Sequence, residues 1–91
     1  MSRVYWAEMA ESARDARIEF IARTSLDAAL EQFEEVHRQT TRLLTFKYLG
    51  RPGKTKGTRD LTINRTSFVV TYRIIGDNIQ IMRFRHASEK S

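Results

Sequence analysis

The strongest constraint on the fold is a run of β-branched and aromatic residues late in the chain. Residues 68–75 read FVVTYRII, a composition that favours an extended strand over a helix. Gly76, Asp77 and Asn78 follow, and these residues have the chemistry of a tight turn between antiparallel strands. Residues 79–86 then supply the returning strand. The sequence therefore predicts a β-hairpin as the last part of the fold.

The first half of the chain has the periodicity of two helices. Residues 3–6 form a short opening strand, and helical spacing starts at Glu8. Ser25 interrupts the pattern and suits the N-cap of a second helix, with Asp27 in its positive first turn. Two helices joined by so short a break are expected to form an antiparallel hairpin. The apolar residues at helical spacing are Met9, Ala13, Ala16 and Phe20 in the first helix and Leu26, Leu30, Phe33, Val36, Leu43 and Leu44 in the second.

The segment between these halves holds a loop and one more strand. Residues 50–57 contain three glycines and the only proline, so they cannot form a helix or a central strand. Residues 58–63 are a strand, and residues 64–67 are a turn. The order is then β-α-α-β-β-β in a single domain, residues 1–91. This order predicts an α+β fold in which a helical hairpin packs on one face of a sheet that ends in a three-strand antiparallel meander.

A two-residue turn at Gly76 and Asp77 fixes which hairpin residues share a face. It places Val70 opposite Arg83. The face toward the helices would hold Phe68, Val70, Tyr72, Ile74, Ile79 and Ile81. The opposite face would hold Val69, Thr71, Arg73, Gln80, Met82, Phe84 and His86. A turn longer by one residue would exchange the two sets on the last strand. The aromatic residues expected in the core are Trp6, Phe20 and Phe33.

The charge of the chain is divided unevenly. Six Lys and Arg stand against eight Asp and Glu before Lys47, and ten stand against three from Lys47 onward. The two parts therefore carry formal charges of −2 and +7. Cations gathered on one surface attract phosphate groups or an acidic protein partner, although they can also form an ordinary solvated surface. The cations of the basic part that carry this signal are Arg51, Lys54, Lys56, Arg59, Arg65, Arg73, Arg83 and Arg85.

Few residues offer catalytic chemistry. The chain has no cysteine, which excludes disulfides and thiolate metal sites, and its two histidines lack the spacing of metal ligands. The run from Lys54 to Lys56 lacks the Gly-Lys-Ser/Thr spacing of a phosphate-binding P-loop. His86 could serve as a general acid or base because histidine titrates near neutral pH, or it could be a partly buried, hydrogen-bonded side chain. We expect no metal and no other cofactor.

An ordered set of segments resembles the RelE/ParE family of toxins. The glycine-rich loop and the following strand (GRPG at 50–53, GTRDL at 57–61) are similar to those of the family. So are the last two strands, FVVTYRI at 68–74 and IQIMRFRH at 79–86, and the opening strand with its helical hairpin. The resemblance implies the toxin of a type II toxin–antitoxin module in the bacterial cytoplasm, away from the membrane. It also implies a small cognate antitoxin as partner.

The resemblance implies one of two targets. ParE-like toxins inhibit DNA gyrase and have no nuclease activity, whereas RelE-like toxins cleave messenger RNA on the ribosome without a metal. Only in the second case is the chain an enzyme, with His86, Arg83 and Arg73 as the catalytic residues. The tail beyond His86 has no tyrosine, and its Glu89 falls near where the RelE pattern has an arginine. A carboxylate there would oppose phosphate binding.

We therefore expect a ParE-like inhibitor of gyrase that arrests growth. The alternatives are ribosome-dependent cleavage of messenger RNA and a non-toxic basic domain that binds nucleic acid. In each case the residues expected to contact the target are Lys54, Lys56, Arg59, Arg65, Arg73, Arg83 and Arg85.

Overall fold

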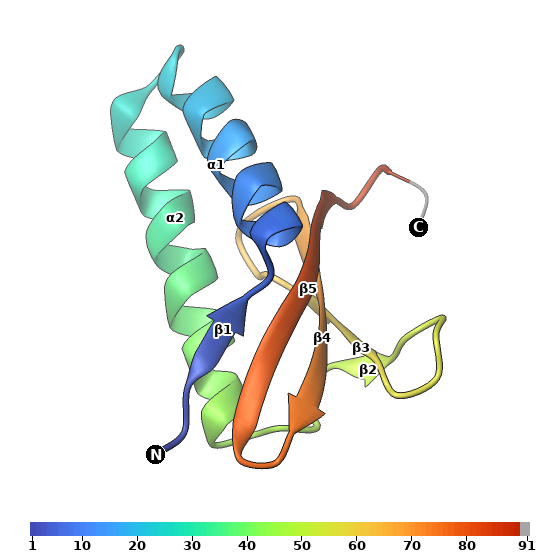
Figure 1. Ribbon diagram of the computed structural model, residues 1–91. Coiled ribbons are helices and arrows are strands. Elements are labelled where there is room, and N and C mark those ends of the chain that lie inside the picture. Colours follow the sequence, from blue (N-terminus) through green and yellow to red (C-terminus); the bar gives the residue numbers. More distant parts are fainter. Residues whose placement is uncertain (90–91) are drawn as a thin grey trace.

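The computed structural model describes residues 1–89 as a helical hairpin lying on one face of a five-stranded sheet (Figure 1). The elements in chain order are β1 (Val4–Trp6), α1 (Glu8–Ala22), α2 (Leu26–Thr41), the short 3-10 helix η1 (Arg42–Leu44), β2 (Arg51–Pro52), β3 (Arg59–Thr62), β4 (Phe68–Ile75) and β5 (Asn78–His86). The strand order is β1-β5-β4-β3-β2, with β1 parallel to β5 and the other pairs antiparallel. The predicted α+β fold and its final meander are confirmed. The sequence did not indicate the two-residue edge strand β2.

The helices begin where the sequence predicts. Ser25 has an extended backbone, and its Oγ accepts a hydrogen bond from the N–H of Ala28 at 3.1 Å, so it is the N-cap of α2. Helix α1 has no side-chain cap, but Glu8 and Glu11 place negative charge at the positive end of its dipole. Helix α1 packs on both α2 and β5. No helix among residues 1–89 is long and apolar enough to cross a membrane.

The hairpin of β4 and β5 has the predicted turn, but its register changes part-way along. Near the turn, Tyr72 pairs with Ile81, as a two-residue turn requires. The next pair is Thr71 with Arg83, which leaves Met82 as an extra residue on β5. This irregularity is a β-bulge, and it displaces every later pair by one residue.

Beyond the bulge, each residue of β5 lies on the face of the sheet opposite to the one predicted for it. Val70 pairs with Phe84, so the prediction that it lies opposite Arg83 is wrong. Because side chains alternate along a strand, Phe84 and His86 lie on the helix side of the sheet and not on the opposite face. Arg83 and Arg85 take their places on the opposite face, and Phe84 is buried in the core.

The core fills the space between the helical hairpin and the sheet. The helix-facing residues predicted for β4 and β5 are confirmed, five of them buried and Ile74 partly buried. Trp6 is partly buried against the core and packs near Phe84, with ring centroids 6.2 Å apart. The ring of Phe84 also lies 4.7 Å from that of Phe68. The helices contribute the buried or partly buried side chains of Ala10, Ala13, Ile18, Ile21 and Val36.

The apolar stripe predicted to bury α1 is mostly exposed. Phe20 is 64% exposed and Phe33 of α2 is 38% exposed, so the prediction that both are core aromatics is wrong. Helix α1 has a second apolar stripe about a quarter-turn away, formed by Ala10, Ile18 and Ile21, and this stripe packs against the core on the sheet. Periodicity alone does not decide between two stripes on one helix. The large apolar side chains that the helices leave exposed are Met9, Phe20, Leu26, Leu30 and Phe33.

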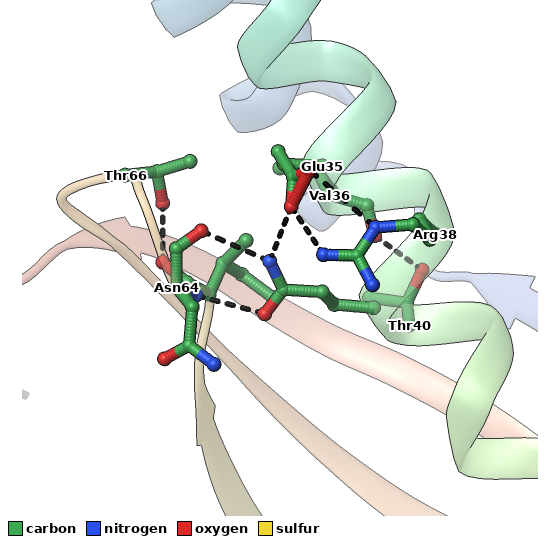
Figure 2. A network of polar contacts seen from close by, with 8 residues as sticks. Glu35, Val36, Arg38, Thr40, Asn64 and Thr66 are labelled. Atoms are coloured by element: carbon green, nitrogen blue, oxygen red, sulfur yellow. Dashed lines mark hydrogen bonds and ion pairs between the residues drawn. The ribbon is translucent and has the colours of Figure 1, made fainter.

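A polar network ties α2 to the turn between β3 and β4 (Figure 2). The buried side chain of Gln39 donates to the carbonyl of Asn64 at 2.9 Å and accepts from its N–H at 2.8 Å. Gln39 also donates to Glu35, which pairs with Arg38. The hydrogen bonds from Arg38 and then from Gln39 hold the pKa of Glu35 below its usual value. The network fixes the end of β3 against the helix.

Tyr72 joins the sheet to the segment that follows the helices. Its side chain is 0% exposed, and its hydroxyl donates to the carbonyl of Lys47 at 2.7 Å. The same oxygen accepts from the N–H of Gly50 at 2.9 Å. A Cβ at Gly50 would lie 2.7 Å from the Tyr72 ring, so this close approach requires glycine.

Replacing Tyr72 with phenylalanine tests this junction. The substitution leaves the buried Gly50 N–H and the Lys47 carbonyl without their partner, which should lower the free energy of unfolding by about 1–3 kcal/mol. Denaturant titration measures the loss, and a variant as stable as the parent would contradict the assignment.

Burial also raises the pKa of Tyr72. Parent stability should therefore fall as the pH rises above about 10, where the unfolded tyrosine ionises first, and the variant should lack this component.

Candidate functional site

The face of the sheet opposite the helices carries all three predicted cations of β4 and β5. No helix among residues 1–89 covers this face, and the loop between β2 and β3 projects beside it (Figure 1). Alternation along the strands brings Arg73 of β4 onto the same face as Arg83 and Arg85 of β5. Asp60 of β3 lies on this face as well, paired with Thr71.

Asp60 neutralises one of these cations. Its carboxylate accepts a hydrogen bond from the hydroxyl of Thr71 at 2.6 Å and lies 3.6 Å from the guanidinium of Arg85. The Arg85 side chain is only 14% exposed. Arg85 is therefore an internal support of this face, and its charge is matched within the chain.

Arg73, Arg83 and Lys54 form what we call the basic face. Arg73 and Arg83 are both exposed, and the Nε of Arg73 donates to Gln80 at 2.8 Å, which orients its guanidinium. Lys54 comes from the projecting loop and lines a shallow hollow of about 280 Å³ together with Arg83. The other side chains around this hollow are Thr55, Thr58, Asp60, Thr71 and Met82. The hydroxyls of Thr58 and Thr71 already donate within the chain, to the Thr55 carbonyl and to Asp60, so the two cations are the groups that suit a carboxylate or a phosphate of a partner.

The other predicted target contacts lie elsewhere or are already engaged. Lys56 is exposed in the loop. Arg59 donates to the carbonyl of Gly50 at 2.8 Å, so it serves as a structural tie. Arg65 lies beside glutamates of α2, among them Glu35, and is not part of the basic face. The sequence places these cations near one another along the chain, but the fold disperses them.

His86 lies at the end of β5 on the helix side. Its ring is edge-on to Phe68, with centroids 6.4 Å apart, and its Nδ1 is 2.7 Å from the Ser88 Oγ. Glu89 accepts a hydrogen bond from the His86 backbone N–H at 3.2 Å and forms an ion pair with Arg17 of α1. The hydrogen bond from Arg17, followed by that from His86, lowers the pKa of Glu89. Residues 86–89 are thus held against α1.

The fold does not bring the three predicted catalytic residues together. His86 is on the helix side of β5, whereas Arg73 and Arg83 are on the opposite face. Proton transfer and charge stabilisation at one phosphate require the groups to converge on it. The three residues therefore do not share one site, and their catalytic roles remain a prediction. Among residues 1–89, no group of three histidine or acidic side chains is placed to hold a metal ion.

Comparison with known proteins identifies the family. Residues 4–91 match the family described as "ParE toxin of type II toxin-antitoxin system, parDE". The chain belongs to the ParE toxin family. It is 27% identical over 88 residues to a protein of Sinorhizobium fredii (strain NBRC 101917 / NGR234) named "Putative toxin Y4kP", covering 97% of this chain and 91% of that protein.

Solved structures agree with this family. A chain of the chromosomal ParDE toxin–antitoxin system from P. aeruginosa superposes with a TM-score of 0.80 at 27% identity, over 94% of this chain and 96% of that one. A chain of the E. coli DinJ-YafQ complex shares the fold alone, with a TM-score of 0.55 at 12% identity over 93% and 91% of the two chains. The resemblance to RelE/ParE toxins is confirmed, and the protein is a ParE-like toxin of a type II system.

Proposed function

We propose that this toxin arrests growth by inhibiting DNA gyrase through its basic face, and that a cognate antitoxin neutralises it. The observation that supports the proposal is the separation of Arg73 and Arg83 from His86 across the sheet. A surface with exposed cations and no histidine beside them suits binding to an acidic or phosphate-bearing partner. ParE-family membership points to the same activity.

Ribosome-dependent cleavage of messenger RNA is the second candidate. The observation in its favour is a hollow of about 250 Å³ on the helix side, where His86 lies beside Arg17 and Phe20. A histidine next to a cation could act on a phosphodiester, but Arg17 is already paired with Glu89. Because the Glu89 carboxylate already neutralises Arg17, this hollow is a poor binding site for a phosphate.

Purified components distinguish the two candidates. The toxin should inhibit gyrase-catalysed DNA supercoiling, and it should leave messenger RNA intact on translating ribosomes. Reversing two charges, with Arg73→Glu and Arg83→Glu together, should raise the toxin concentration for half-inhibition at least about tenfold, because the basic face loses both of its arginines. The matched control is Arg3→Glu with Arg65→Glu, which changes the net charge equally at exposed positions elsewhere and should leave inhibition unchanged. Unaltered inhibition by a folded Arg73/Arg83 variant would remove the basic face from the mechanism.

His86 separates binding from catalysis. In a gyrase inhibitor no proton moves at His86, so His86→Gln should arrest growth at the same toxin level as the parent. A general acid or base is typically worth about 10²–10⁴-fold in rate, so the same variant of a ribonuclease would lose nearly all activity. Growth arrest is measured by titrating toxin expression, with folding checked by circular dichroism. A folded His86→Gln protein without growth arrest would establish the nuclease in place of the gyrase inhibitor.

The apolar stripe of α2 is our choice for the antitoxin-binding surface. Leu26, Leu30 and Phe33 recur at helical spacing and are exposed along one side of the helix. Exposed apolar residues in such a row are typical of helix-in-groove or helix-on-helix binding. In a toxin–antitoxin module the antitoxin is the partner available to cover them.

Polar substitution on this stripe should weaken neutralisation. Leu26→Ser with Leu30→Ser removes apolar area worth about 1.5–3 kcal/mol per leucine when fully buried, so antitoxin affinity should fall at least about tenfold. Stability should change little because both side chains are already more than half exposed. Glu31→Ala with Glu34→Ala, at exposed neighbouring positions, is the control. Calorimetric titration with the antitoxin gives the affinities, and equal affinity for the leucine variant and the parent would place the antitoxin elsewhere.

A further inference from the structure

A tight turn after the helices exposes three large apolar side chains. The N–H of Leu49 donates to the carbonyl of Phe46 at 3.1 Å, so residues 46–49 close a four-residue turn, which we call the aromatic turn. Turns are usually built from glycine, proline and small polar residues. Here Phe46 and Leu49 are about half exposed and Tyr48 is 71% exposed. Such exposure is unfavourable in water unless a partner covers it.

The fold holds the aromatic turn rigidly. The buried hydroxyl of Tyr72 bonds to the backbone of Lys47 and Gly50, on either side of Tyr48. The ammonium group of Lys47 reaches across to the turn between β4 and β5, donating to Gly76 O at 3.3 Å and lying 3.4 Å from the Asp77 carboxylate. A preorganised surface loses little conformational entropy when it binds, so its exposed side chains can contribute strongly to affinity.

Arginines surround the aromatic turn. The guanidinium of Arg42 lies 5.6 Å from the centroid of Phe46, and that of Arg59 lies 4.9 Å from the centroid of Tyr48. A hollow of about 290 Å³ beside Tyr48 is also lined by Arg73, a member of the basic face. The aromatic turn is therefore continuous with the basic face around the end of the sheet.

We infer that the aromatic turn is a protein-docking surface that takes an apolar side chain flanked by carboxylates from the target of the toxin. Tyrosine and arginine around an apolar centre are the composition of binding hot spots. A single-stranded nucleic acid fits less well, because the Arg59 guanidinium already lies over the Tyr48 ring on which a base would stack, and its Nη1 donates to the carbonyls of Tyr48 and Gly50. The inference rests on the proposed function only in taking the target to be a protein.

Alanine substitution of Tyr48 tests the surface. The toxin level needed for growth arrest should rise at least about tenfold in Tyr48→Ala, as expected for a hot-spot tyrosine. Antitoxin affinity should stay within about twofold of the parent, because the antitoxin surface proposed above lies on α2. Met9→Ala is the control, since Met9 is also a large exposed side chain but belongs to helix α1, away from the uncovered face, and it should behave as the parent. Circular dichroism and thermal unfolding establish that each variant is folded.

Three outcomes would overturn the inference. A folded Tyr48→Ala protein could arrest growth at the parent level, or it could lose antitoxin affinity in parallel with toxicity. In the third outcome the parent binds a fluorescent single-stranded oligonucleotide and the Tyr48→Ala protein does not. The aromatic turn would then bind a nucleic acid. Growth arrest does not presuppose gyrase, so the comparison stands even if the parent fails to inhibit supercoiling. That failure would contradict the proposed function alone.

Discussion

The β-bulge at Met82 is the constraint on which both the core and the basic face depend. If β5 kept a uniform register, Arg83 would lie among the helix-facing residues and Phe84 would be exposed. A buried arginine without a partner costs several kcal/mol, and the core would lose an aromatic side chain as well. The one extra residue places Phe84 against Phe68 and Trp6 and sends both arginines to the uncovered face.

The two-layer architecture then assigns different surfaces to different chemistry. The helices cover one face of the sheet and expose an apolar stripe, whereas the uncovered face presents cations. Tyr72 connects the layers from the centre of the core, since its hydroxyl bonds outward to the segment that carries the aromatic turn. Packing inside the domain thus positions the surfaces that we propose for contact with other molecules.

The element order, the helix cap at Ser25 and the final hairpin could be predicted, because each depends on local periodicity and turn chemistry. The buried face of α1 could not, because that helix has two apolar stripes and only tertiary packing selects between them. No glycine or proline marks the position of the bulge in the sequence, so local residue types do not predict it. One non-local signal was available, since the uniform register would have placed Arg83 opposite the core residue Val70. The dispersal of Arg59 and Arg65 depends on contacts that spacing along the chain does not record.

The rate of methionine oxidation tests most directly whether the uncovered face contacts the target. Met82 lines the hollow of the basic face, and Met9 is exposed on α1. Brief oxidation with hydrogen peroxide, read by peptide mass spectrometry, reports the accessibility of each thioether. Bound gyrase should slow the oxidation of Met82 and leave Met9 at its free rate. Protection of Met9 with Met82 unprotected would contradict the assignment and place the target on the helices.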